Sequence, residues 1–177
     1  SGAAVEVAGP AGTNLYGWKL VLYNGSDGTD YSTITLSGSL PGNCNGYGVA
    51  SFAAPGMQNG APDGVALIDN FGIVRQLLSY EGSFTATSGP AANVISVDIG
   101  VSEGSATPVG QSIQLAGSGS YASDFTWLAP ASASFGQCNP GQTFTGGGGG
   151  GAGNSLQNGV AVSGISGAQG SFTDTYS

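Results

Sequence analysis

Short runs of β-branched, aromatic and other apolar residues recur along the chain, and turn-forming residues separate them. Runs of this length bounded by Gly, Pro, Asn and Asp are typical of β-strands. The pattern predicts nine strands up to residue 128: Val5–Val7, Trp18–Tyr23, Thr33–Leu36, Tyr47–Phe52, Val65–Ile68, Ile73–Tyr80, Val94–Val97, Ser112–Leu115 and Phe125–Leu128. Many short strands at regular spacing indicate an all-β sandwich.

The run from Trp18 to Tyr23 indicates a strand that is buried on both faces. Side chains alternate between the faces of a strand, so even positions from Trp18 to Leu22 share one face and odd positions from Lys19 to Tyr23 share the other. Both faces carry apolar bulk. We therefore expect a central strand whose second face is covered by an aromatic side chain or by a neighbouring subunit.

A glycine-rich segment divides the chain. Residues 145–155 contain six consecutive glycines, a composition typical of a flexible linker. We expect a β-sandwich over residues 1–144, the linker over 145–155, and a C-terminal β-strand extension over 156–177. Within the extension, Leu156–Val162 and Phe172–Tyr176 have strand-forming composition.

Composition and charge narrow the function classes. The 177 residues include 34 Gly and 8 Pro, which disfavour helices, and 40% of residues are hydrophobic, enough for a folded core. The chain has no histidine, and its two basic and ten acidic residues give a net charge of −8. Serine–histidine triads and imidazole metal ligands are therefore excluded within one chain, and two cations cannot neutralise a nucleic-acid backbone.

Membrane insertion and cofactor binding are also not expected. No stretch approaches the roughly 20 apolar residues that a membrane-spanning helix needs. No motif indicates a cofactor.

Cys44 and Cys138 are the two cysteines, and both lie in turn-like contexts rich in Asn, Gly and Pro. We expect them to form one disulfide, which indicates an oxidising, extracellular location. The alternative is two free thiols.

Two motifs resemble those of enzymes, but a loop and a linker explain them better than catalysis or nucleotide binding. Gly100–Gly104 matches the G-x-S-x-G pattern around Ser102, but a nucleophile elbow needs a following helix and a histidine. Gly146–Gly151 matches a nucleotide-binding pattern only because every residue is glycine. We expect a loop at the first motif and the linker at the second.

Acidic residues offer two further candidate sites. Glu81, Asp98 and Glu103 are the acids whose convergence could give a glycosidase pair, although solvated turns are the simpler interpretation. Asn24, Asp27 and Asp30 cluster in one turn and could bind Ca²⁺ through hard oxygen ligands. An ordinary Asx/Gly turn is the alternative. Asn24-Gly25-Ser26 is also the single N-glycosylation sequon.

Most aromatic residues are expected to pack in the core rather than to form a carbohydrate platform. Those considered are Tyr16, Trp18, Tyr23, Phe52, Phe71, Tyr80, Phe84, Phe125 and Trp127.

Several motifs resemble the bacterial version of the lamin tail domain over residues 5–144. They are Val5–Gly12, Gly17–Gly25, Gln58–Leu67, Leu78–Gly82, Asp98–Glu103 and Asp124–Trp127. The resemblance implies an immunoglobulin-like β-sandwich in a secreted protein. It implies no catalytic residues, because domains of this family have none in common and often accompany extracellular nucleases or peptidases.

Residues 156–171 resemble the opening of bacterial pre-peptidase C-terminal domains. A lamin tail domain has a further strand before Val5, and a pre-peptidase domain continues beyond Tyr176. A sandwich without its first strand exposes an apolar groove and an unpaired edge, which a tethered β-strand could fill in a neighbouring copy.

The sequence therefore predicts a secreted, non-catalytic structural protein that self-associates into an oligomer or filament by strand exchange. The expected contact residues are Leu156, Val160, Val162, Ile165, Phe172 and Tyr176. The alternative is an accessory or binding module cleaved from a larger secreted nuclease or peptidase. The sequence leaves two further points open. The Ser- and Thr-rich surface could carry glycans, and the extension could dock within its own chain.

Overall fold

The computed structural model describes residues 2–146 and 160–166, and it is almost entirely β-structure. Over these residues it has eleven strands and one short 3₁₀ helix, η1 (Ala122–Asp124). The strands are β1 (Ala4–Pro10), β2 (Lys19–Asn24), β3 (Thr29–Thr35), β4 (Tyr47–Ala53), β5 (Asp63–Ile68), β6 (Val74–Tyr80), β7 (Val97–Asp98), β8 (Gln111–Gly119), β9 (Phe125–Ser132), β10 (Gln142–Phe144) and β11 (Ala161–Ser166).

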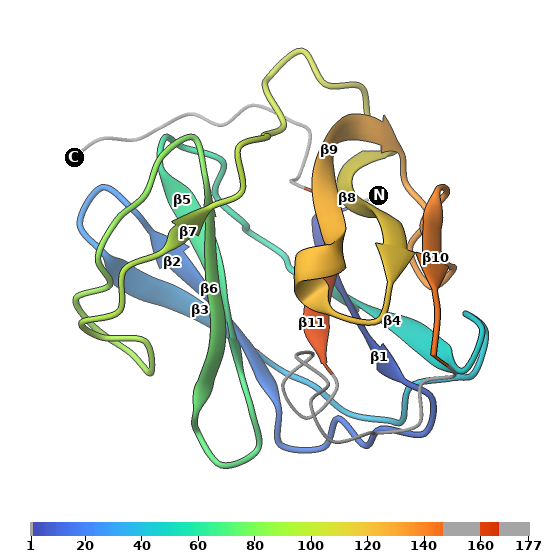
Figure 1. Ribbon diagram of the computed structural model, residues 1–177. Helices are drawn as coiled ribbons and strands as arrows, with labels where there is room; N and C mark the ends of the chain where they lie inside the picture. The colour runs from blue at the N-terminus through green and yellow to red at the C-terminus, as the bar shows by residue number, and fades with distance from the viewer. Residues whose placement is uncertain (1, 147–159, 167–177) are drawn as a thin grey trace.

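The strands form two sheets that face each other (Figure 1). One sheet has five strands in the order β3-β2-β5-β6-β7. The other has six strands. Five follow the order β10-β8-β11-β1-β4, and the sixth, β9, lies off this path and pairs with β8. This arrangement confirms the predicted all-β sandwich, whereas its immunoglobulin-like type remains a prediction.

The main core lies between the sheets and follows the alternation of each strand. Leu20 and Leu22 enter it from β2, Val5 and Val7 from β1, and Ile113 from β8. Val162 and Ile165 of β11 belong to the same cluster. The C-terminal strand therefore contributes to the central core.

A second apolar cluster covers the outer face of the five-stranded sheet. Val21 and Tyr23, on the opposite face of β2 from Leu20, are fully buried against Phe84 and Ala91. The ring centroids of Tyr23 and Phe84 are 6.2 Å apart. The second face of β2 is thus covered by an aromatic side chain, one of the two alternatives predicted from its pattern, and the residue belongs to the same chain.

A third cluster covers the outer face of the six-stranded sheet. Phe144 of β10 stacks on Tyr47 with ring centroids 4.6 Å apart, and it also contacts Phe125. Cys44 and Ala161 lie in the same cluster. Both sheets are therefore packed on their inner and outer faces.

Two strand predictions need correction, and one strand was not predicted. β7 is only Val97–Asp98, because Val94 lies in the loop that packs over the outer face of the five-stranded sheet. β10 was not predicted, since its three residues are too short to show alternation. The strand expected at Leu156–Val162 instead runs from Ala161 to Ser166 over the described residues.

Within the described ranges, no helix has the length and apolar character needed to cross a bilayer.

Cys44 and Cys138 form the predicted disulfide; their Cα atoms are 5.7 Å apart and their sequence separation is 94 residues. Replacing both cysteines by Ala should lower the free energy of unfolding by about 4–5 kcal/mol, because the unfolded chain gains the entropy of a long open loop. Denaturant unfolding at one fixed protein concentration measures the change.

Reductant provides the control for this prediction. It should lower the denaturation midpoint of the wild-type protein and leave that of the double variant unchanged. Equal stability of the oxidised and reduced wild-type proteins would contradict the prediction.

Candidate functional site

The slot between β1 and β8 is the most distinctive site in the fold. β11 fills it and pairs antiparallel with both neighbours. On the β1 side, Val5 is opposite Ile165 and Val7 is opposite Val162. On the β8 side, Ile113 is opposite Ile165. Without β11, β1 and β8 would each have an unpaired edge facing the slot.

All six residues of β11 are buried. Val162 is fully buried and Ile165 is 3% exposed. Burial of an aliphatic side chain contributes about 1.5–3 kcal/mol, a large share of the stability of an ordinary domain. β11 therefore stabilises the whole sandwich.

Ser163 forms a β-bulge in β11. Glu6 is opposite Gly164, but the next residue, Val7, is opposite Val162, so Ser163 is the extra residue on β11. The bulge has a packing reason, because Val162 and Ile165 both belong to the core between the sheets although they are three residues apart. Strict alternation would place them on opposite faces.

The bulge removes main-chain groups from the regular ladder; two side chains bond to these groups instead, and a third bonds to the hydroxyl of Ser163. The side-chain oxygen Oε1 of Gln76 on β6 accepts a hydrogen bond from the main-chain N–H of Val162 (2.8 Å). The amide of Asn139 donates to the carbonyl oxygen of Ser163 (2.8 Å). The hydroxyl of Ser163 donates to Oε1 of Glu6 (2.9 Å). We call Glu6, Gln76 and Asn139 the bulge socket.

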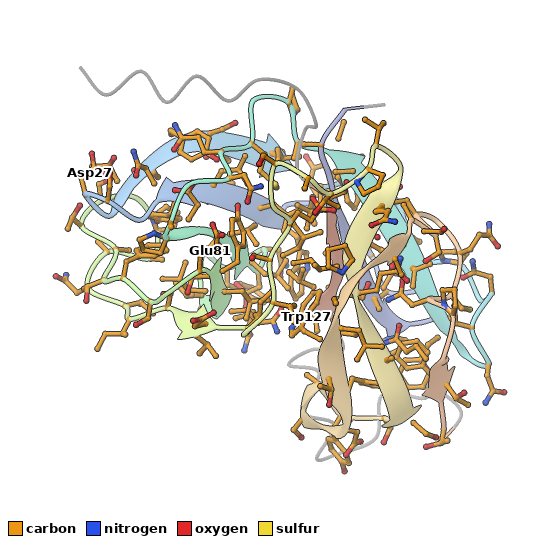
Figure 2. The ribbon with its side chains drawn as sticks, turned by 90° about the horizontal axis from the view of Figure 1, so that it is seen from above. Asp27, Glu81 and Trp127 are labelled. Carbon is orange, nitrogen blue, oxygen red and sulfur yellow. A yellow bond between two sulfur atoms is a disulfide. The ribbon has the colours of Figure 1, made fainter. Side chains whose placement is uncertain are left out.

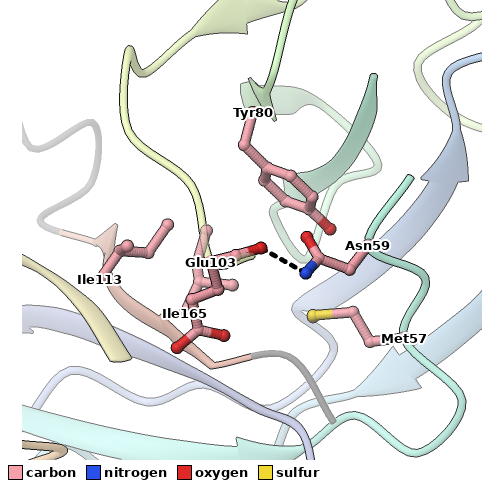
Figure 3. Close-up of a pocket in the computed structure, with 6 residues that line it drawn as sticks. All are labelled: Met57, Asn59, Tyr80, Glu103, Ile113 and Ile165. Atoms are coloured by element: carbon pink, nitrogen blue, oxygen red, sulfur yellow. Dashed lines mark hydrogen bonds between the residues drawn. The ribbon is translucent and has the colours of Figure 1, made fainter. Parts of the chain in front are cut away.

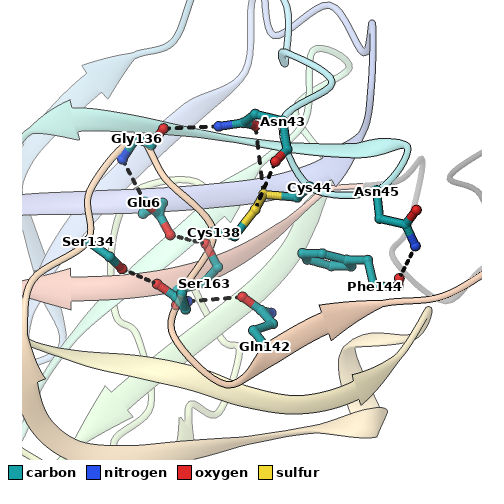
Figure 4. Close-up of a disulfide and its surroundings, with 11 residues drawn as sticks. Glu6, Asn43, Cys44, Asn45, Ser134, Gly136, Cys138, Gln142, Phe144 and Ser163 are labelled. Carbon is teal, nitrogen blue, oxygen red and sulfur yellow. Dashed lines mark hydrogen bonds between the residues drawn. A yellow bond between two sulfur atoms is a disulfide. The ribbon is translucent and has the colours of Figure 1, made fainter.

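The loop between β9 and β10 holds two sides of the socket in place (Figure 4). Its Gly136 N–H donates to Oε2 of Glu6 (3.0 Å). Asn139 follows Cys138 directly, and it is further fixed by a hydrogen bond from the hydroxyl of Ser134 (2.9 Å). The disulfide to Cys44 therefore anchors the loop that carries Asn139.

Glu6 is a buried carboxyl group, with 1% of its surface exposed. Burial raises the pKa of Glu6 to about 7, because desolvation disfavours the charged form. The hydrogen bonds from Ser163 and Gly136 oppose this shift and only partly offset it. Near neutral pH, the charge next to the bulge therefore depends on pH.

The structure places three of the six residues predicted to mediate self-association. Val160, Val162 and Ile165 are buried in the core between the sheets of the same chain. Leu156, Phe172 and Tyr176 lie outside the described residues.

A small pocket lies beside the C-terminal end of β11, where Ile165 forms part of its wall (Figure 3). Met57, Ile113 and Ile165 give it apolar walls, and Tyr80 and Glu103 add polar groups. The amide of Asn59 donates to the main-chain oxygen of Glu103 (2.5 Å). Ile165 thus contributes both to the core and to this pocket.

The carboxylates considered for catalysis have different surroundings. Glu103 lines the pocket, whereas Asp98 is exposed and accepts a hydrogen bond from the main chain of Gly100 (2.9 Å). The hydroxyl of Ser102 donates to exposed Glu81 (3.4 Å). Among the described elements, the one that comes next after Gly104 is the strand β8 and not a helix.

The three oxygen ligands considered for Ca²⁺ each bond to nearby groups. Asn24 accepts from Ser26 in an Asx turn, and Asp27 likewise accepts from Thr29. Asp30 accepts from the hydroxyl of Ser88 (2.5 Å). Asp27 lies at the outer end of the molecule, well away from Glu81 (Figure 2). Over the described residues, no three or more Asp, Glu, Cys or His side chains are grouped to hold a metal ion.

Two of the aromatic residues predicted to pack in the core are instead exposed. Tyr16 is 78% and Phe71 is 77% exposed, and both lie in turns. Trp127, by contrast, packs from β9 against two apolar clusters (Figure 2).

Sequence reasoning missed the bulge socket. Glu6 lies between two valines in a strand, a position at which an acidic residue normally faces solvent. Gln76 and Asn139 carry no motif. The one available signal is the spacing of Val162 and Ile165, which does not fit simple alternation and indicates a bulge at Ser163-Gly164.

Comparisons with known proteins return no match to the chain among family models, curated proteins or solved structures.

Burial of Glu6 makes the stability of the fold depend on pH. Its pKa rises from 4.5 to about 7 on folding, so between these values the folded state binds more protons than the unfolded state. The contribution of Glu6 to stability is therefore largest below pH 4.5, falls as the pH rises, and levels off above pH 7. The loss that Glu6 contributes is about 3 kcal/mol. Denaturation midpoints between pH 4.5 and pH 8 measure it.

Glu6→Gln should flatten this part of the pH profile, because the amide keeps the size of the side chain and does not titrate. Glu81→Gln, at an exposed carboxylate, is the matched control and should keep the wild-type profile. A Glu6→Gln profile that still falls as in the wild type would contradict the assignment.

Proposed function

We propose that this protein is a non-catalytic, extracellular structural subunit that self-associates by strand exchange. Residues 160–166 of one copy would fill the slot between β1 and β8 of the next copy. Successive copies would then form a filament.

The observation that carries the proposal is the position of β11 in the interior of a sheet. β11 is the last strand described, yet it pairs with β1, the first strand, and with β8. Every one of these contacts can also form between two chains, because a swapped strand makes the same contacts as it makes within its own chain. The slot is therefore suited to a strand from either source.

The length of chain before β11 allows the exchange. Residues 147–159 separate the preceding described segment from Val160. Thirteen residues span at most about 45 Å when fully extended. Neighbouring strands lie about 4.8 Å apart, so this length exceeds the width of a six-stranded sheet.

Strand exchange of this kind has a defined assembly geometry. Each copy would donate β11 from its C-terminal part and accept β11 at a different surface, the slot. When each copy donates to the next, this contact is heterologous, and it extends into an open filament unless rotation closes it into a ring, whereas reciprocal exchange between two copies would give a dimer.

The disulfide between Cys44 and Cys138 supports an extracellular location, because disulfides of this kind persist in oxidising compartments. The resemblance to the lamin tail domain is consistent with this location.

Electron microscopy of the purified full-length protein tests the proposal. We expect regular fibres, and a variant with Ile165→Asp should form none, because it places a charge in the core that β11 completes. Leu128→Asp, at a half-exposed position of β9, is the control and should keep the fibres. Monodisperse wild-type particles of about the monomer mass, 17.2 kDa, would overturn the proposal and favour a binding module.

A further inference from the structure

We propose that the bulge socket, formed by Glu6, Gln76 and Asn139, selects which strand the slot accepts and in which register. Its partner is the segment Val160–Ser166 of a second copy of this chain. The feature that the socket recognises is the order apolar-Ser-Gly-apolar at residues 162–165. This inference rests on the proposed strand exchange and adds specificity to it.

Main-chain pairing alone would give little selectivity. Any extended segment can supply the N–H and C=O groups of a ladder, and apolar side chains at alternate positions fit many sequences. The bulge socket differs because its three side chains bond to one particular irregularity. Gln76 accepts from the N–H of Val162, Asn139 donates to the oxygen of Ser163, and Glu6 accepts from the hydroxyl of Ser163.

A strand in a shifted register would lose all three hydrogen bonds together. It would move the bulge away from Glu6 and Asn139, which are 1% and 3% exposed and have no access to compensating water. Buried polar groups that lose their partners are costly, and a carboxylate more so than a neutral group. The correct register is thus favoured by polar contacts in addition to apolar packing.

The residue beside the bulge is also restricted. A Cβ atom at Gly164 would lie 3.4 Å from Cβ and 3.6 Å from Oε1 of Glu6, and 3.7 Å from the ring of Phe135. These are ordinary van der Waals distances, so glycine and alanine both fit there, and a larger side chain would have to share this space with Glu6 and Phe135. The bulge socket therefore favours a small residue next to a hydroxyl-bearing residue.

The three side chains come from separate parts of the fold and converge only when both sheets are in place. Glu6 is on β1, Gln76 reaches from β6 of the opposite sheet, and Asn139 belongs to the disulfide-anchored loop. The bulge socket thus depends on the tertiary fold of the acceptor, which contributes a side chain to it from three sides.

Incorporation of labelled peptides into the full-length protein tests the inference. The probe is a fluorescein-labelled peptide of residues 159–167, incubated with the purified protein and followed by fluorescence anisotropy and size-exclusion chromatography. When the peptides are compared on the wild-type protein, only the peptide changes, so the fold of the protein is unaffected. We expect the wild-type peptide to be incorporated, and the Ser163→Ala peptide to bind at least tenfold more weakly, because it leaves the buried carboxyl group without its hydroxyl partner.

A Ser166→Ala peptide is the matched control. The hydroxyl of Ser166 also makes a hydrogen bond, to the main-chain oxygen of Gln111 (2.8 Å), but it lies outside the bulge socket. Its loss should change binding by less than threefold. In a Glu6→Ala protein, the wild-type and Ser163→Ala peptides should bind equally, since the group that distinguishes them is gone.

The outcomes separate this inference from the proposed function. Equal binding of the wild-type and Ser163→Ala peptides to the wild-type protein would overturn the selectivity and leave strand exchange intact. Equal weakening by Ser163→Ala and Ser166→Ala would also overturn it, because any hydroxyl would then serve. Incorporation of no peptide would overturn both the selectivity and the exchange on which it rests.

Discussion

The sandwich depends on the pairing of its first and last described strands. β1 has β4 on one edge and β11 on the other, and β11 connects it to β8. Glu6 and Ser163, which meet in this pairing, are 157 residues apart in the sequence. Contacts of such separation form late, because the entropy of a long loop opposes them. Until a strand enters the slot, β1 and β8 keep open edges and the core between the sheets lacks Val162 and Ile165.

The slot combines two kinds of interaction with different consequences. Apolar packing of Val162 and Ile165 supplies the stabilising energy and tolerates related side chains. The polar contacts of the bulge contribute less net energy, yet they are costly to leave unmade. Glu6 takes part in both kinds of interaction, because its side chain is buried and also makes polar contacts. Burial raises its pKa to about 7, so the carboxyl group is mostly uncharged only below this pH. The disulfide adds a covalent tie that holds the loop carrying Asn139 near the bulge.

Much of the fold could be predicted from the sequence because period-2 alternation is a local property. The apolar residues on the two faces of β2 are buried in two different clusters, as the pattern of Trp18 to Tyr23 indicated. The disulfide was also foreseen from the two cysteines. The prediction failed where local patterns break: β10 is too short to alternate, and the bulge at Ser163 interrupts the alternation of β11.

The sequence by itself determined an acidic, glycine-rich all-β chain with a strand-forming segment after a run of glycines. Only the tertiary structure decided where that segment lies and what it contacts. Glu6, Gln76 and Asn139 are far apart in sequence and carry no motif, so their convergence on Val162 and Ser163 arises only when both sheets and the disulfide-linked loop come together. The physical reason is that strand composition specifies a β conformation locally, whereas the partner of each strand is set by long-range packing.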